Sequence, residues 1–77
     1  MSFRNWTVEQ VANWIASLNN VPVEYGQLFR ERMIDGNQME LYRSVAELKT
    51  IGVDKLGDRI RISIAINRKL YEKITVQ

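Results

Sequence analysis

Three cationic side chains, Lys55, Arg59 and Arg61, lie close together at the start of the segment that ends the chain. If a helix begins there, its unpaired amide groups add a partial positive charge to that of the side chains. This combination is typical of a surface that binds anionic groups such as carboxylates or phosphates. The alternative is that Arg59 merely pairs with Asp58 or with another nearby carboxylate.

The middle of the chain carries the opposite charge. Residues 1–48 hold four basic and six acidic side chains, a net charge of −2, whereas residues 49–77 hold seven basic and three acidic side chains, a net charge of +4. Such asymmetry indicates electrostatic binding of a partner, although both halves could simply be solvated. The acidic stretch also contains apolar residues, of which Met39 and Tyr42 could instead complete the core. Its members are Glu31, Asp35, Met39, Glu40, Leu41, Tyr42 and Glu47.

Most catalytic and metal chemistry is excluded by composition. The chain has no histidine and no cysteine, which removes the usual base at neutral pH, the commonest metal ligand, thiolates and disulfides. Its four glycines match no nucleotide-binding pattern. No apolar run is long enough to span a membrane. We therefore expect no enzyme activity, cofactor, metal or small-molecule substrate, and a cytoplasmic location, with the nucleus as the alternative.

The first two elements are predicted to be helices. The segment from Thr7 to Gln10 has the form of a capping box, so a helix is expected to start at Thr7 and to end at Asn19-Asn20. Pro22 suits the first turn of a second helix, which Gly36 would end by taking a positive φ. The apolar spacing predicts the buried side of this second helix, namely Tyr25, Leu28, Phe29 and Met33.

The second half of the chain predicts three further helices. Residues 37–43 are long enough for only one or two turns, and Ser44 to Glu47 again has the form of a capping box. Four isoleucines then alternate with other residues over 60–66, as in a strand. We prefer one long helix from about Gly57 to Ile74, because no other segment offers a strand as partner. The expected fold is all-α: four shorter helices packed against one long C-terminal helix.

At this point the sequence resembles a sterile alpha motif (SAM) domain. The whole chain, 1–77, would be a single domain with a core of about 5–74, and the fold that the resemblance implies is a compact five-helix bundle with a long last helix. The resemblance lies in the order and spacing of several segments, which are Trp6 to Val11 with Trp14-Ile15, Tyr25 with Phe29, Ile34-Asp35-Gly36, Leu48 to Val53, and Lys55 to Ile62.

The resemblance implies a protein-protein interaction module of a signalling or scaffold protein. SAM domains commonly pair head to tail, an end-helix face of one domain meeting a mid-loop face of another domain or of a second copy. By position, the end-helix face would comprise Lys55, Leu56, Gly57, Arg59 and Arg61, and the mid-loop face Glu31, Met39, Glu40 and Glu47.

A second hypothesis uses the same basic corner differently. Some members of this family bind an RNA hairpin through cations at the start of the last helix. Lys55, Arg59, Arg61 and Arg68 could contact phosphates in this way. Asp54 and Asp58, which lie within the same patch, and the low net charge of +2 argue against it.

Overall fold

The structure is a computed structural model that describes residues 3–75, with side chains described through Tyr71. Four α-helices and two 3-10 turns follow one another within these residues, and none of them forms a strand. The all-α prediction is therefore confirmed, as is the helical interpretation of the four isoleucines. The elements are η1 (Phe3–Asn5), α1 (Val8–Ala16), α2 (Glu24–Glu31), η2 (Met39–Tyr42), α3 (Val45–Thr50) and α4 (Leu56–Thr75).

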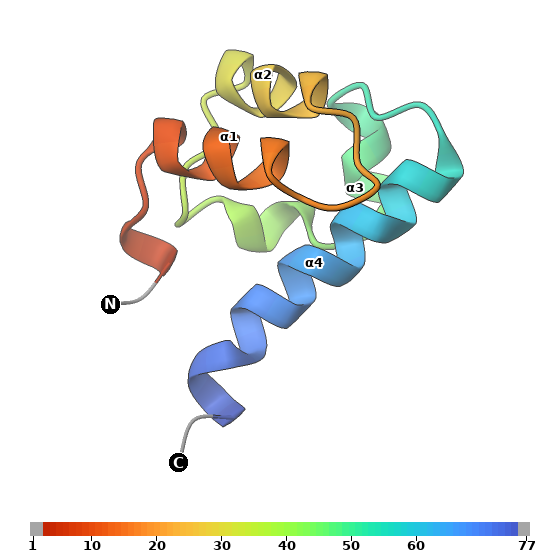
Figure 1. Cartoon of the computed structure of the whole chain (residues 1–77). Helices are drawn as coiled ribbons and strands as arrows, with labels where there is room; N and C mark the ends of the chain where they lie inside the picture. The colour runs from red at the N-terminus through yellow and green to blue at the C-terminus, as the bar shows by residue number, and fades with distance from the viewer. Residues whose placement is uncertain (1–2, 76–77) are drawn as a thin grey trace.

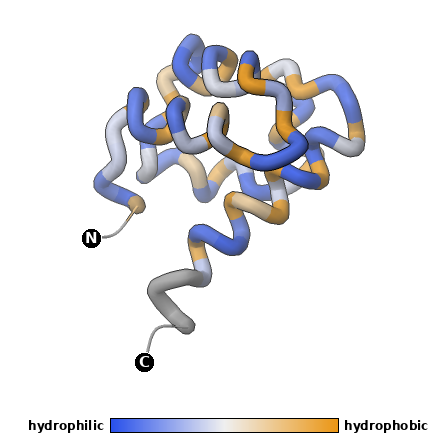
Figure 2. The backbone as a smooth tube through the Cα atoms, in the orientation of Figure 1, coloured by the Kyte–Doolittle hydropathy of each residue, from blue (hydrophilic) through white to orange (hydrophobic). Residues whose placement is uncertain are grey.

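The helices form two groups around one core. Helices α1 and α2 lie side by side, and α4 runs diagonally beneath them, with η2 and α3 also above α4 and packed against it (Figure 1). Hydrophobic and hydrophilic positions alternate along each helix, as expected where only one side is buried (Figure 2). The core is built from side chains of all these elements, including Val11, Ile15, Phe29, Leu48, Ile62 and Ile66.

Local hydrogen bonds start two of the helices where the sequence predicted. The Thr7 hydroxyl accepts a hydrogen bond from the Gln10 amide at 3.1 Å, and the Gln10 side chain accepts one from the Thr7 amide at 2.8 Å, so the capping box is complete. The Ser44 hydroxyl accepts a hydrogen bond from the Glu47 amide at 3.2 Å at the start of α3. Helix α1 stops earlier than expected, at Ala16, and the left-handed residue that turns the chain is Asn20, with φ of 62°.

The second helix differs from its prediction at both ends. It begins at Glu24 rather than at Pro22 and ends at Glu31, because Met33 adopts a left-handed φ of 57°. Met33 is therefore turned outward and is not part of the buried side of α2. Gly36 has no positive φ, contrary to our expectation. It is needed because a β-carbon there would overlap the carbonyl group of Phe3.

The third of the five predicted helices is the 3-10 turn η2. This turn is only four residues long, and it places Met39 in the core. Ser63 and Asn67 of α4 donate hydrogen bonds to the carbonyl oxygen of Arg43, at 2.6 and 3.0 Å, which fixes the connection between η2 and α3 against the long helix.

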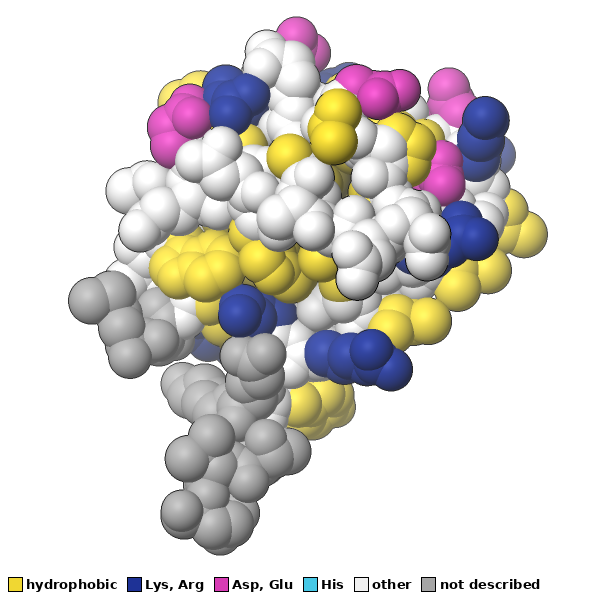
Figure 3. Space-filling view, viewed as in Figure 1, with side chains coloured by type: hydrophobic (Ala, Val, Ile, Leu, Met, Phe, Trp, Pro, Cys, Tyr) yellow, Lys and Arg dark blue, Asp and Glu magenta, His cyan; other side chains and the backbone are white. Residues whose placement is uncertain are grey.

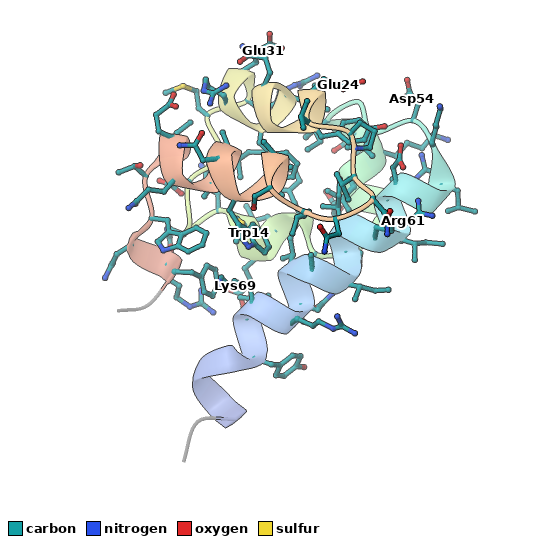
Figure 4. All side chains as sticks on the ribbon, viewed as in Figure 1. Trp14, Glu24, Glu31, Asp54, Arg61 and Lys69 are labelled. Carbon is teal, nitrogen blue, oxygen red and sulfur yellow. The ribbon has the colours of Figure 1, made fainter. Side chains whose placement is uncertain are left out.

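Aromatic rings join the N-terminal segment to α4. The ring of Trp6 makes edge-to-face contacts with Phe3 and with Trp14, at centroid distances of 6.4 and 5.9 Å. The ammonium group of Lys69 on α4 lies 5.2 Å from the ring centroid of Trp6 and 5.8 Å from that of Trp14. Figure 4 shows Lys69 directed toward Trp14. Cation–π contacts of this kind stabilise the corner.

Candidate functional site

The residues around the start of α4 form an exposed tip. Lys55 precedes the helix, Leu56 and Gly57 begin it, and all three are exposed. Arg61 follows one turn later, with 52% of its side chain exposed and its Nη1 atom 3.5 Å from Oδ1 of Asp58. We call Lys55, Leu56, Gly57 and Arg61 the tip. It brings two outward cations and an exposed leucine to the positive end of the helix dipole.

Arg59 does not belong to this tip, which corrects the sequence-based assignment. Its Nη1 atom donates hydrogen bonds to the carbonyl oxygens of Val53 and Asp54, at 2.9 and 2.8 Å, so the side chain folds back over the loop. Its Nε atom is buried, without a hydrogen-bond partner among the described residues. The alternative pairing of Arg59 with Asp58 is also wrong, since Asp58 pairs with Arg61. Arg59 therefore holds the loop before α4, with its guanidinium turned toward the carbonyl oxygens of that loop.

Asp58 ties the tip to the body of the domain. It is the one charged side chain that is buried among the described residues. The hydroxyl of Tyr25 on α2 donates a hydrogen bond of 2.7 Å to Oδ2 of Asp58. Burial, together with this hydrogen bond and the charge of Asp58, raises the pKa of Tyr25 to about 12. The contact positions the first turn of α4 relative to α2.

Only some of the residues predicted for the mid-loop face are exposed. Glu31 at the end of α2 and Glu47 on α3 are exposed, as an interaction surface requires. Glu40 is exposed as well, but the guanidinium of Arg4 donates a hydrogen bond to it at 2.8 Å. That contact and the charge of Arg4 lower the pKa of Glu40. Met39 has no exposed surface, so its assignment to this face is wrong: it fills the core.

Two exposed apolar residues were not assigned to the mid-loop face from the sequence, although the sequence places Leu41 in the acidic stretch. Met33, just after α2, is 68% exposed, and Leu41 in η2 is 64% exposed. The periodicity of α2 placed Met33 in the core, because it assumed a helix that continues beyond Glu31. An apolar residue between two acidic ones, as Met33 is between Glu31 and Asp35, was the available signal.

The acidic and basic residues face different directions. In Figure 4, Glu31 projects from the upper end of α2, whereas Arg61 lies beside the first turns of α4 at the right. Arg68 of α4 is exposed as well, further along the same helix. Three or more His, Cys, Asp or Glu side chains that could hold a metal ion do not come together anywhere in residues 3–71. None of the helices described is long and apolar enough to cross a membrane.

Comparison with known protein sequences agrees with the helical fold described above. The family model of the SAM domain (sterile alpha motif) matches residues 4–69. A mitogen-activated protein kinase kinase kinase of Pyricularia oryzae, MST11, is 33% identical over 96% of this chain and 8% of its own length. The mouse sterile alpha motif domain-containing protein 11 is 34% identical over 84% of this chain and 12% of its own length.

The mouse Polycomb protein SCMH1 is 34% identical over 83% of this chain and 9% of its own length. The chain thus spans about a tenth of the length of these curated relatives. No solved structure matches the chain significantly. The helix order, the long last helix and the match over most of the sequence agree, and the chain belongs to the SAM domain family.

Proposed function

We propose that this SAM domain pairs head to tail with another SAM domain or with a second copy of itself. The basic side of the contact is the tip, formed by Lys55, Leu56, Gly57 and Arg61. The acidic side is a mid-loop face formed by the exposed carboxylates of Glu31 and Glu47 together with the exposed apolar side chains of Met33 and Leu41. Through such pairing the domain would act as the interaction module of a signalling or scaffold protein.

The observation that carries the proposal is the exposed leucine among outward cations at the tip. Leu56 can supply apolar area at the centre of a contact, while Lys55 and Arg61 meet carboxylates around it. Small interfaces are commonly built with an apolar centre and a polar rim, and complementary charges speed the encounter. The Tyr25–Asp58 contact supports the same role, because it holds the tip in one orientation before a partner arrives.

The stoichiometry follows from the positions of the two faces. They lie on different elements, so a copy that uses its tip still has its mid-loop face free. A contact between unlike faces does not close through a twofold axis, and it extends into an open helical filament if copies of this chain pair with one another. Pairing with a different SAM domain would stop at a complex of defined size if that domain has only one competent face.

Binding of an RNA hairpin remains the alternative use of the tip. Of the four cations that the sequence offered for it, Arg59 is engaged with backbone carbonyls. The remaining three are widely spread, since Lys55 precedes α4 and Arg61 and Arg68 lie about two turns apart on it, and they support a weaker phosphate contact than the sequence suggested. A cytoplasmic or nuclear location stays a prediction under either function.

Sedimentation velocity over a concentration series tests the pairing. The experiment compares the wild type with the tip variant Lys55→Glu/Arg61→Glu and the mid-loop variant Glu31→Gln/Glu47→Gln, whose neutral side chains cannot attract the acidic tip of the first variant. We expect concentration-dependent association of the wild type and none for either variant alone. An equimolar mixture of the two variants should form a 1:1 complex that does not grow, because each variant keeps one intact face.

Salt and a matched control make the test specific. Raising the salt from about 0.1 M to about 1 M, which shortens the Debye length from about 10 Å to about 3 Å, should weaken the complex. Arg68→Glu reverses a charge about two turns beyond the tip and should leave association unchanged. If the wild type stays monomeric, mixtures with the SAM domains of MST11 and SCMH1 test pairing with another SAM domain. Absence of association in all these samples would contradict the proposal, and binding of hairpin RNA in its place would favour the alternative.

A further inference from the structure

A row of exposed apolar side chains runs along the outer side of α4. Ile60, Ile64 and Tyr71 are 42%, 47% and 54% exposed, whereas Ile62 and Ile66 on the inner side are fully buried. At the helical repeat the three exposed residues share one narrow arc, and they span about 16 Å of the helix axis. Figure 3 shows hydrophobic side chains along the outer edge of this helix, with Lys and Arg side chains beside them. We call Ile60, Ile64 and Tyr71 the α4 ridge.

The charge around this ridge is positive. By helical position, Arg61 and Arg68 follow one edge of the ridge, and both are exposed. Asp58 is the only acidic side chain that α4 contributes between residues 56 and 71, and it is buried against Tyr25. Arg68 has no carboxylate partner among the described side chains. Over residues 56–71 the helix therefore presents aliphatic and aromatic surface next to the charge of Arg68, which no described carboxylate pairs with.

Shape and charge together define the occupant. A straight row of side chains at four- and seven-residue spacing is the kind of ridge that packs into the groove of a second helix. A partner helix with apolar residues on one side and Glu or Asp beside them would cover the apolar row and neutralise Arg68. A second copy related by a twofold axis through α4 would instead bring the arginines of both copies together, which is repulsive. A lipid surface is bound by a broader apolar face than this single row of three side chains.

We propose that the α4 ridge is a second docking surface, which binds an acidic amphipathic helix of another protein through Ile60, Ile64 and Tyr71 and pairs with it through Arg68. This goes beyond the head-to-tail pairing, because none of these four residues belongs to the tip or to the mid-loop face. One domain could then hold a SAM partner at its tip and a helical partner along its last helix.

A designed peptide tests this surface. The probe is a fluorescently labelled helical peptide with leucines at three- and four-residue spacing and glutamates beside them, and its binding is followed by fluorescence anisotropy. Ile64→Ser should weaken binding of the probe at least about tenfold, and Arg68→Glu by a similar factor. Val23→Ser removes an even more exposed apolar side chain, at the residue before α2, and should change nothing. A peptide of the same composition in scrambled order should bind at least about tenfold more weakly than the probe.

Any of the following outcomes would contradict the proposal. Equal binding of the ordered and scrambled peptides, or an unchanged affinity of Ile64→Ser, would show that the ridge is not the site. Loss of self-association in Ile64→Ser would identify a second copy as the occupant, and binding to phosphatidylserine vesicles without binding to the probe would identify a membrane. Lys55→Glu separates this test from that of the head-to-tail pairing, because it should weaken self-association and leave probe binding intact.

Discussion

The hydroxyl of Tyr25 and the carboxylate of Asp58, 33 residues apart in the sequence, form a hydrogen bond of 2.7 Å that joins α2 to the first turn of α4. Because Asp58 is buried, its charge depends on this bond and on the 3.5 Å contact with Arg61 for its stabilisation. The tip of the domain is therefore anchored through a polar contact and not only through the core.

Removal of this anchor should destabilise the domain. We expect Tyr25→Phe to lower the free energy of unfolding by about 1–3 kcal/mol, because it leaves a buried carboxylate without its donor. Urea denaturation followed by circular dichroism measures the change. Tyr71→Phe removes an exposed hydroxyl and should stay within about 0.5 kcal/mol of the wild type. Equal stabilities of the two variants would contradict the anchoring role.

The raised pKa of Tyr25 predicts a loss of stability at alkaline pH. The phenol ionises at about 12 in the folded protein and at about 10 in the unfolded chain. The stabilisation by the neutral phenol is present below pH 10 and is lost as the pH rises from about 10 to about 12, because only the unfolded state releases its proton there. The free energy of unfolding of the wild type minus that of Tyr25→Phe should shrink over this range. A constant difference would argue against the shift.

The ion pair between Arg4 and Glu40 should be visible by titration. Arg4 lowers the pKa of the Glu40 carboxyl through a hydrogen bond and its charge. The small stabilisation from this exposed pair is present above the pKa of an unfolded glutamate and is lost as the pH falls through the lowered value. In Arg4→Gln, the pKa of Glu40 should return toward its ordinary value, as carboxyl carbon NMR shifts would report. A pKa of Glu40 that does not change in Arg4→Gln would contradict the ion pair.

Replacement of Gly26 should be costly although alanine favours helices. An alanine in the middle of a helix gains up to about 1 kcal/mol over glycine. A β-carbon at Gly26 would, however, lie 2.6 Å from the carbonyl oxygen of Ala12, so α1 and α2 would have to move apart. We expect Gly26→Ala to lower the melting temperature, with a net cost of about 1–3 kcal/mol. Gly57→Ala meets only the end of the Arg61 side chain and should be neutral or stabilising.

Truncation of Met39 and of Met33 should have different effects on stability and on association. Met39→Ala should cost about 2–5 kcal/mol, because it leaves a cavity in the core. Met33→Ala should change stability by less than about 0.5 kcal/mol, yet weaken head-to-tail association if the mid-loop face is as proposed. Thermal unfolding and sedimentation velocity provide the two measurements. Similar stability losses in both variants would contradict the finding that Met39 is buried whereas Met33 is exposed.

The contrast between these methionines shows which features could be predicted from the sequence. Helix starts that depend on residues three apart, such as Thr7 with Gln10 and Ser44 with Glu47, were predictable because donor and acceptor are neighbours in the chain. The outward turn of Met33 was not predictable, because the chain reversal that follows α2 depends on the close contact of Gly36 with Phe3. That contact joins segments more than 30 residues apart.

The candidate site likewise combines features that the sequence predicts with features that it does not. The sequence located the cations of the tip, because charge and helix start are local properties. It did not show that Arg59 turns back toward the carbonyls of Val53 and Asp54 whereas Arg61 stays exposed, since this depends on the path of the loop. The exposure of Met33 was missed for the same reason, whereas the sequence already placed Leu41 in the acidic stretch.

The packing of Lys69 against Trp6 and Trp14 makes the intrinsic tryptophan fluorescence of the domain sensitive to this contact. Both indole rings lie at the junction between the N-terminal segment and α4, and they are the only tryptophans of the chain. Their emission therefore monitors whether that corner remains closed. A partner bound at the tip should leave the spectrum unchanged, so separation of the N-terminal segment from α4 can be followed without an added label.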